Sequence, residues 1–412
     1  MSTIVVVTGR GLICSLGDDP SRVHAALSEG KSGLGPVELF ETKALTRPVA
    51  GEIKDFNAKT YLGAKNVRPL DRTSRLVTVA AQLALADSGW SAEARAAHEI
   101  GLVLGTVYGS VRTIAEFDRR ALEAGPLYAS PMDFANTVIN AAAGQAAIWH
   151  GLRGINSTVS TGQSSGLQAI AYAAGLIASG RADVLLAGGA EELCLESFLS
   201  MERAGLVSLA EPDPVPFEAE RRGFLPGEGV ALLVMESAAL AKRRGARILA
   251  EVRGTGTAFD PTLGTDEQQA LRAAELALRS ALGAAGLGPD EIGALSVSAN
   301  GGPLDALQAK ALARVLGARA GALPVTAIKA SLGDTLGADG GLQAVVAVES
   351  LGSGEVPGIR GFRSPGPEFP FPLAGAQPRP LAGASVLVSS AGWDGHHCAL
   401  VISKPAARAD AC

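Results

Sequence analysis

The chain has 412 residues, of which 47% are hydrophobic and 19% are charged. That length allows two core-forming units, or one large domain built from two halves. The formal net charge is −5, and lysine and arginine form no dense block, so nucleic acid is not expected as a partner. Glycine is abundant, at 51 residues, and only 4% of the residues are aromatic, which favours a small-residue core with close backbone packing.

Cysteine usage and the longest apolar runs bear on the cellular compartment. Cys14, Cys194, Cys398 and Cys412 show no metal-binding or redox spacing, and so few cysteines in this length indicate a reducing cytoplasm. The N-terminal segment lacks a basic stretch followed by a long apolar one. The longest apolar runs, such as Val230–Met235, are far below the roughly 20 residues that span a bilayer. We therefore expect a cytoplasmic protein with no membrane contact.

The first part of the chain alternates between predicted strands and helices. Buried strands are expected at Ile4–Thr8, Ile100–Leu104 and Val184–Ala187, because each is a short apolar run. A helix is expected over Asp71–Ser88, where apolar residues recur at helical spacing and a glycine follows. Ser164–Ala178 is apolar or small nearly all round, which is typical of a helix buried on every side.

The same pattern then restarts in the second part of the chain. The expected elements are strands at Gly229–Glu236, Ile248–Val252 and Ala294–Ser298, helices at Ala238–Arg244, Ala270–Ala285 and Gly340–Leu351, and, after a proline-rich connector at Ser364–Pro380, a closing antiparallel pair at Ser385–Ser389 and Ala399–Ser403. Alternating strands and helices imply a largely parallel α/β core that is covered on both faces. Because fully buried helices need a layer on each side, we expect sheets that sandwich helices, in two halves, 1–240 and 241–412.

The segment Thr8-Gly-Arg-Gly11 follows the first expected strand and superficially resembles a dinucleotide-binding loop. It lacks the third glycine and the later acidic partner that such a loop needs. We therefore interpret it as a tight strand-to-loop turn and expect no nucleotide cofactor.

The segment Ser160-Thr-Gly-Gln-Ser-Ser-Gly166 lies where a strand ends and the buried helix begins. A side chain there is close to unpaired backbone N–H groups and to the positive end of the helix. A cysteine in that place would ionise easily and would be a strong nucleophile. This sequence has Gln163 there instead.

The chain resembles the β-ketoacyl synthases of the thiolase superfamily over nearly its whole length. The segments that carry the resemblance are Val5–Gly17, Asp71–Gly89, Asn136–Asn156, Ala182–Glu191, Pro216–Glu236, Ala238–Gly256 and Ala327–Gly341. The most specific is PFEAERRGFLPGEGVALLVME at Pro216–Glu236, in which a GEG turn follows F-x-x-x-R. The resemblance implies an α/β thiolase-like fold, a layered αβαβα sandwich of two similar halves.

The resemblance also locates the residues that would carry the chemistry. A working ketosynthase needs a cysteine that carries the acyl chain and two histidines that stabilise the thioester oxyanion and the enolate formed by decarboxylation. Matched motif by motif, the cysteine of the family's TACSSG falls at Gln163, the histidine of AHGT at Asn300, and the histidine of K-S-x-x-G-H at Asp334, while its lysine is kept as Lys329. No catalytic residue is intact.

The pattern of replacement discriminates among functions. A glutamine for the cysteine with both histidines kept would indicate a malonyl decarboxylase, but here both are gone and an aspartate would repel the developing enolate charge. The combination resembles the chain length factors, or KSβ subunits, of type II polyketide synthases. Gln163 is also interpretable as a buried polar residue without a role, and Asp334 as an ion-pair partner of Lys329 rather than a base.

Other candidate residues have competing interpretations. Ser164 and Ser165 are tempting nucleophiles, but no histidine is expected beside them and serines commonly cap helices. Trp393 matches the gating phenylalanine of the family's glycine-rich GFGG loop and would plug the channel more firmly. His396 and His397 follow in the same segment, but adjacent residues rarely bind one metal ion and no cluster completes a site, so no metal is expected.

The resemblance implies a dimer in which each acyl pocket runs toward the neighbouring subunit. A silent subunit paired with an active ketosynthase (KSα) would then line the end of the acyl tunnel and limit its length. Candidate lining residues are Tyr108, Val111, Arg112 and Ala115, expected on one helical face, and Met132, Phe134 and Val138, expected before or at the start of the next helix. Ordinary packing is the competing interpretation for each of them.

The expected mechanism belongs to the pair. The active partner is acylated on its cysteine, malonyl on acyl carrier protein is decarboxylated, and Claisen condensation extends the chain, with no cofactor because only thioesters react. Two rivals remain: an acyltransferase or hydrolase rebuilt on Ser164 or Ser165, and a stand-alone protein that binds acyl groups or acyl carrier protein. The sequence does not indicate the chain length or whether the product is an aromatic polyketide or a polyene.

Overall fold

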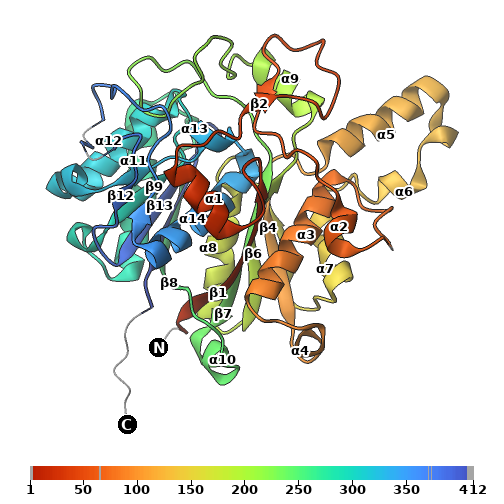
Figure 1. The fold of residues 1–412 in the computed structure, drawn as a ribbon, viewed down its shortest axis with the longest axis horizontal. Helices are drawn as coiled ribbons and strands as arrows, with labels where there is room; N and C mark the ends of the chain where they lie inside the picture. The colour runs from red at the N-terminus through yellow and green to blue at the C-terminus, as the bar shows by residue number, and fades with distance from the viewer. Residues whose placement is uncertain (1–2, 65, 370, 373, 406–412) are drawn as a thin grey trace.

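The structure is a computed structural model that describes residues 3–64, 66–369, 371–372 and 374–405. Within these ranges ten strands form one mixed sheet, and helices cover it (Figure 1). Cys412 and parts of the proline-rich connector lie outside the described residues. Among the described residues, no helix is long and apolar enough to cross a membrane.

The sheet consists of two halves with the same topology. From the seam outwards, the first half contains β1 (Val5–Cys14), β7 (Gly229–Ser237), β6 (Val184–Glu191), β4 (Ile100–Gly105) and β5 (Asn156–Val159). The second half contains β8 (Ala250–Phe259), β14 (His396–Ser403), β13 (Ser385–Ala391), β9 (Ala294–Val297) and β10 (Val325–Thr326). In each half the two pairs nearest the seam are antiparallel and the two outer pairs are parallel. The halves meet where β1 pairs with β8.

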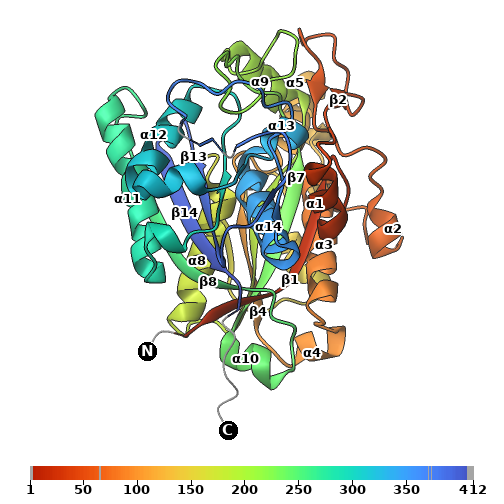
Figure 2. The ribbon, with the colours of Figure 1, turned by 60° about the vertical axis from the view of Figure 1, so that its left-hand side comes forward.

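Helices form three layers around these two half-sheets (Figure 2). The longer helices are α3 (Arg72–Asp87) and α7 (Ala141–His150) outside the first half, α8 (Ser165–Ala178) and α14 (Asp339–Ser353) between the halves, and α11 (Glu267–Ala285) and α12 (Leu304–Leu316) outside the second half. The largest hydrophobic cluster joins both central helices to strands of both halves. This is the layered αβαβα sandwich that the resemblance implied, and the buried helix expected at 164–178 is α8.

Shorter elements connect this framework. The remaining helices are α1 (Pro20–Ser28), α2 (Ala58–Leu62), α4 (Ala92–Ala96), α5 (Val111–Ala124), α6 (Pro131–Phe134), α9 (Leu195–Arg203), α10 (Ala238–Arg243) and α13 (Lys329–Leu332). Short 3-10 helices lie at Pro126–Tyr128, Pro289–Glu291, Gly317–Ala322 and Leu336–Ala338. Two small antiparallel pairs join β2 (Gly35–Pro36) to β3 (Val49–Ala50) and β11 (Glu355–Val356) to β12 (Arg379–Pro380).

Local side-chain chemistry sets the ends of the helices. Asp71 caps α3 by accepting a hydrogen bond from the Ser74 amide, as is usual at a helix N-terminus. Helix α11 begins three residues before the expected Ala270, because Asp266 caps it there. It ends at Gly286, whose φ of 65° is the left-handed conformation that glycine adopts without steric cost.

The expected turn at Thr8–Gly11 was wrong. These residues lie inside β1, which continues to Cys14 and pairs with β7 on both sides of a register shift between Val7 and Gly9. A Cβ atom on Gly9 or Gly11 would overlap the backbone of α3. The glycines therefore serve close packing of a helix against the strand rather than a turn or a nucleotide.

Candidate functional site

Three loops bring the predicted catalytic positions together at the carboxyl ends of parallel strands. Gln163 lies between β5 and the start of α8 in the first half of the chain. Asn300 follows β9, and Asp334 follows β10 and the short helix α13, so both come from the second half. The carboxyl ends of parallel strands are where α/β folds place their functional residues.

The Asp334 carboxylate is the centre of the cluster. Its Oδ2 atom accepts hydrogen bonds from Gln163 Nε2 at 2.9 Å and from Asn300 Nδ2 at 2.7 Å. Its Oδ1 atom accepts a hydrogen bond from the Leu336 amide at 3.0 Å. Gln163 and Asp334 are both buried. The side-chain amides of Gln163 and Asn300 are therefore both hydrogen-bonded to the carboxylate of Asp334.

Lys329 balances the buried charge. Its Nζ atom lies 3.2 Å from Asp334 Oδ2 and 3.3 Å from Asp339 Oδ2, and all three side chains are buried. Burial by itself disfavours the ammonium, but the two carboxylates outweigh it and raise the pKa of Lys329. Burial, opposed by Lys329 and assisted by Asp334, raises the pKa of Asp339 to about 7.

Asp305 holds the loop that carries Asn300. The buried carboxylate accepts hydrogen bonds from the amides of Phe217, Asn300 and Gly301 at 2.8–3.0 Å. Burial raises its pKa to about 6, against the effect of these three N–H donors. Sequence reasoning missed Asp305, and its only signal was its place five residues after Asn300.

The neighbouring serines are engaged in helix-end hydrogen bonds. The Ser164 hydroxyl donates to the Thr161 carbonyl at 3.1 Å, and the Ser165 hydroxyl donates to the Gly162 carbonyl at 2.5 Å. Both side chains are fully buried, and among the described residues neither is hydrogen-bonded to a histidine. The geometry thus offers no activated serine nucleophile.

The loop between β13 and β14 closes over this centre. Trp393 stacks on Phe224 with ring centroids 5.8 Å apart and an interplanar angle of 7°. The next residue, Asp394, accepts a hydrogen bond from the backbone N–H of Gln163 at 3.1 Å through Oδ2. Sequence reasoning singled out Trp393 and missed Asp394, whose contact joins residues 231 positions apart.

The two adjacent histidines lie on a strand rather than in that loop. His396 and His397 begin β14, and His397 is paired with Ala391 of β13. His397 is buried with both ring nitrogens unpartnered among the described residues, and burial lowers its pKa. Within the same residues, no group of three or more His, Cys, Asp or Glu side chains is arranged to hold a metal ion.

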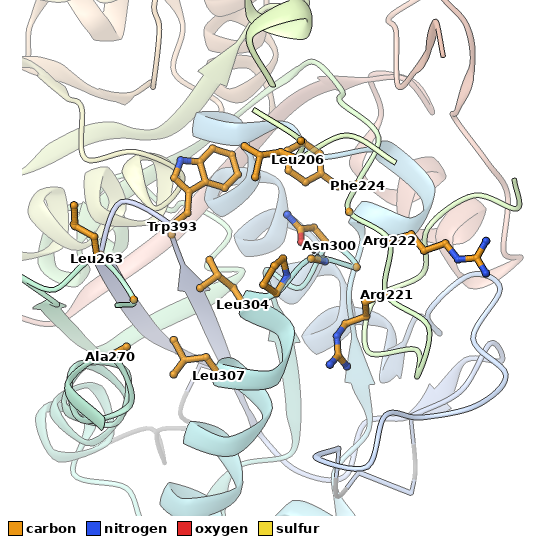
Figure 3. Close-up of a pocket in the computed structure, with 18 of the residues that line it drawn as sticks. Leu206, Arg221, Arg222, Phe224, Leu263, Ala270, Asn300, Leu304, Leu307 and Trp393 are labelled. Atoms are coloured by element: carbon orange, nitrogen blue, oxygen red, sulfur yellow. Dashed lines mark hydrogen bonds between the residues drawn. The ribbon is translucent and has the colours of Figure 1, made fainter. Parts of the chain in front are cut away.

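A cavity of about 570 Å³ leads toward the centre (Figure 3). Leu206, Phe224 and Trp393 gather on one side of it and Leu304 and Leu307 on the other, with Asn300 between the two groups. Arg221 and Arg222 also line it. Among the described residues, its lining reaches Asn300 and Trp393 but includes neither Gln163 nor Asp334. The open space thus stops short of the position where a nucleophile would stand.

The predicted tunnel residues lie elsewhere, on and around an arm that projects from the body of the molecule (Figure 1). Val111, Arg112 and Ala115 lie in α5, and Met132 and Phe134 lie in α6. Val138 follows α6 and precedes α7. The rings of Phe117 and Phe134 lie 5.9 Å apart and connect the two helices.

The expectation that Tyr108 shares a helical face with Val111 was wrong. Helix α5 begins at Val111, so Tyr108 lies before it. The Tyr108 amide donates to Glu191 Oε1 at 3.0 Å and the Val107 amide to Oε2 at 2.7 Å, which hold this segment in a non-helical conformation. Burial raises the pKa of Glu191 to about 7 against these donors.

The arm exposes a group of large hydrophobic side chains. The exposed large hydrophobic residues within 122–139 are Leu122, Leu127, Tyr128, Met132, Phe134, Val138 and Ile139. Leu127 is 97% exposed and Phe134 is 61% exposed. Exposed groups of apolar side chains of this kind are found where proteins bind other molecules.

A second surface has the same character. Within the described residues β5 is an edge strand of the sheet, with β4 as its one neighbour. It is flanked by α7 and α8, whose residues Ile148 and Tyr172 are exposed at 79% and 46%. An open edge with unpaired backbone groups is a ready template for a strand of another chain.

Comparison with known proteins identifies the family to which these features belong. The N-terminal domain model of β-ketoacyl synthases matches residues 2–241, and the corresponding C-terminal domain model matches residues 249–363. The chain belongs to the β-ketoacyl synthase family.

Curated relatives of two kinds resemble the chain to the same degree. The tetracenomycin polyketide synthase ketoacyl synthase beta subunit of Streptomyces glaucescens is 33% identical over 411 residues, which are 97% of this chain and 98% of the relative. The 3-oxoacyl-[acyl-carrier-protein] synthase 2 of Vibrio cholerae is also 33% identical, over 86% of this chain and 87% of the relative. Overall identity therefore does not separate a beta subunit from a catalytic synthase.

Solved structures agree with the fold. The ishigamide ketosynthase/chain length factor superposes with a TM-score of 0.90 and 28% identity, over 98% of this chain and all of that chain. A β-ketoacyl synthase from Burkholderia phymatum gives a TM-score of 0.89 and 27% identity over the same shares. The framework is that of a ketosynthase, and the local chemistry at residues 163, 300 and 334 has to distinguish the function.

Proposed function

We propose that this chain is a non-catalytic chain length factor (KSβ). It pairs with an active ketosynthase (KSα) and shapes the acyl tunnel that sets chain length during condensation of malonyl units on acyl carrier protein. The observation that carries this proposal is the hydrogen-bonded cluster in which Gln163 and Asn300 both donate to Asp334.

That cluster provides none of the groups that condensation requires. Carbon–carbon bond formation needs a thiolate to carry the acyl chain and donors that stabilise an oxyanion and an enolate. An amide at residue 163 cannot form a thioester. The Asp334 carboxylate lies where negative charge would develop, and Asn300 is already hydrogen-bonded to it. The site disfavours decarboxylation for the same reason, because an enolate would meet a carboxylate of like charge.

The exposed surfaces support a partner subunit. The exposed hydrophobic side chains of the arm and the open edge at β5 are both features that association with a second chain would bury. The tetracenomycin relative is by name a beta subunit, and the ishigamide structure is by name a ketosynthase/chain length factor. We extend that pairing to this chain.

In the proposed pair, the chemistry belongs to the partner. Its cysteine receives the acyl group, malonyl thioester loses carbon dioxide to give an enolate, and the enolate carbon attacks the acyl carbonyl and releases the thiolate. This chain contributes Phe134, Met132 and Val138 as tunnel wall, with Val111, Arg112 and Ala115 on the adjoining helix and Tyr108 before it. Trp393 is assigned to a gate that remains closed. Acyl carrier protein delivers the substrates, and the free thiols of the described cysteines fit a cytoplasmic setting.

Two other functions are less well supported. An acyltransferase or hydrolase built on Ser164 or Ser165 would require an accessible hydroxyl beside a base, whereas both hydroxyls are buried and donate to backbone carbonyls. A stand-alone protein that binds acyl groups or acyl carrier protein would leave the exposed hydrophobic side chains of the arm uncovered.

The first experiment compares the chain alone with the chain in a pair. Purified alone and given malonyl-acyl carrier protein, it is expected to form no condensation product by mass spectrometry. Co-expressed with an intact ketosynthase encoded beside it, it is expected to co-purify as a heterodimer that makes an extended chain. Condensation by the isolated chain would overturn the proposal.

The second experiment tests the tunnel wall. Phe134→Ala in the heterodimer removes a ring from the proposed end of the tunnel, so the product is expected to lengthen or to become a mixture of lengths. Leu276→Ala is the matched control, since Leu276 is an exposed hydrophobic residue on α11. An unchanged product distribution in Phe134→Ala would remove Phe134 from the tunnel.

A further inference from the structure

The β13–β14 loop holds a carboxylate against the start of the central helix. Asp394 Oδ2 accepts a hydrogen bond from the Gln163 amide at 3.1 Å, and Asp394 Oδ1 accepts one from the His396 amide at 3.0 Å. The carboxylate lies directly over Gly162, where a Cβ atom would overlap it. Both oxygens are thus engaged, one of them with the residue at the nucleophile position.

The backbone N–H of Gln163 is the group that an acyl-transfer site would need unoccupied. When a nucleophile attacks a thioester carbonyl, the oxygen becomes an oxyanion that backbone N–H groups stabilise, commonly including the N–H of the nucleophilic residue itself. The amide at residue 163 lies beside the N-terminus of α8, which adds the favourable end of a helix dipole. A carboxylate already bound there both occupies the donor and repels an oxyanion.

The same contact fastens the loop. Trp393 is held on Phe224 by ring stacking, and Asp394 is held by a hydrogen bond from the backbone N–H of Gln163, so consecutive residues anchor the loop to two separate segments. Trp393 and Asn300 both line the cavity (Figure 3). With the loop in this position the cavity ends before residue 163.

We propose that Asp394 is a latch that closes the degenerate centre. Its carboxylate accepts the hydrogen bond of the backbone N–H of residue 163 and fixes the β13–β14 loop. Acyl thioesters are therefore excluded by the Asp394 carboxylate as well as by the absence of the cysteine and the two histidines. This inference rests on the proposed function, because it takes residue 163 as the former nucleophile position. Its consequence is that a cysteine placed at residue 163 reacts more slowly while Asp394 is present than after Asp394 is changed.

The test introduces a thiol at residue 163, beside Asp394. Gln163→Cys is combined with Asp394→Asn, which keeps the side-chain volume and removes the charge, or with Asp394→Gly, which removes the side chain. The pH dependence of alkylation by iodoacetamide measures thiolate formation at residue 163, and mass spectrometry after incubation with octanoyl-coenzyme A measures acylation. Background from the native cysteines is subtracted with the wild-type chain, and thermal unfolding confirms that each variant folds.

The expected result is a graded release. At pH 7, Gln163→Cys/Asp394→Asn is alkylated about tenfold faster than Gln163→Cys, because a nearby carboxylate disfavours the thiolate. Acylation by octanoyl-coenzyme A is at least about tenfold faster in the Asp394→Gly pair, which frees the amide and the loop. Gln163→Cys/Asp290→Asn is the matched control: Asp290 is exposed, and loss of its charge is expected to change neither rate.

The outcomes separate the latch from the proposed function. Equal alkylation and acylation rates with and without Asp394 would overturn the latch while leaving the tunnel role intact. Condensation by the wild-type chain alone would overturn the proposed function, and the paired rates at residue 163 would still report whether Asp394 restrains a thiol there.

Discussion

The degenerate centre and the α5–α6 arm differ in how completely their interactions are satisfied. At the centre, Asp334 is buried and accepts hydrogen bonds from two side chains and a backbone amide, with Lys329 beside it. In the arm no residue of α5 or α6 is buried, and several large apolar side chains face outward. A region whose polar groups are paired internally needs nothing from outside. A region with exposed apolar side chains gains stability only by contact with another molecule.

The largest effect is expected at the centre. Asp334→Ala removes the acceptor for Gln163 and Asn300 and one of the two carboxylates beside buried Lys329. Removal of one partner from a buried ion pair typically costs 3–5 kcal/mol, and because Asp339 remains we expect a loss of about 3 kcal/mol in the free energy of unfolding. Chemical denaturation of the purified chain measures it.

Two further variants sharpen that result. Asp334→Asn keeps an oxygen acceptor and is expected to cost less than Asp334→Ala. Glu41→Ala breaks the exposed ion pair with Lys43 and is expected to leave stability nearly unchanged, because surface pairs contribute little. If Asp334→Ala were as stable as the wild type, the hydrogen bonds and ion pair of Asp334 would not contribute to the stability of the fold.

The next effect is expected in the arm. Leu127 is 97% exposed, so Leu127→Asp introduces a charge without burying it and the isolated chain should fold with unchanged stability. Association with the proposed partner ketosynthase should weaken by about 2 kcal/mol, close to thirtyfold in the dissociation constant. Isothermal titration calorimetry or analytical ultracentrifugation measures it.

Leu276→Asp is the matched control for the arm. It introduces the same charge at an exposed leucine of α11 and is expected to leave association unchanged. If both variants weaken association equally, or neither does, the arm is not the surface that binds the partner.

The last effect concerns a buried acid beside the arm. Glu192 lines a polar cavity of about 680 Å³ that Arg112 of α5 also lines. Burial, assisted by the charges of Asp71 and Glu228, raises the pKa of Glu192 from 4.5 to about 8. Because the folded state holds this proton more tightly, its stabilising contribution is complete below pH 4.5 and is lost as the pH rises through 8.

Glu192→Gln should therefore flatten the decline in stability between pH 5 and pH 8, by on the order of 2 kcal/mol over that window. Glu196→Gln, in the first turn of α9, is the control and is expected to keep the wild-type slope. The melting temperature as a function of pH measures both. An identical slope in the wild type and in Glu192→Gln would show that this carboxyl is not protonated in the folded state at neutral pH.

Regular elements were the easiest part of the structure to predict from the sequence. The bounds of α3 and α8 fell within one residue of the expectation, because caps and apolar spacing are local signals. The turn expected at Thr8–Gly11 failed because glycine has two uses. A glycine that permits a turn and a glycine that admits a helix close to a strand look alike in sequence. The helix expected to include Tyr108 begins after it, because the backbone N–H of Tyr108 donates to a buried glutamate far along the chain.

The candidate site divides in the same way. Motif matching singled out residues 163, 300 and 334, and the structure brings these three side chains into one hydrogen-bonded group. It missed Asp394, since an aspartate in a glycine-rich loop carries no indication of what it contacts. Only the fold brings that loop to the start of α8. Long-range contacts of this kind depend on topology, which local patterns do not encode.

The central position of α8 also has a consequence for biosynthesis. One face of this helix packs against strands of the first half, and another packs against α14 and β14, which are translated at least 160 residues later. Until those segments leave the ribosome, a strongly apolar helix has no cover on that side. The nascent chain is therefore exposed to aggregation while at least 160 further residues are made, and a fragment that ends near residue 240 should require a chaperone to stay in solution.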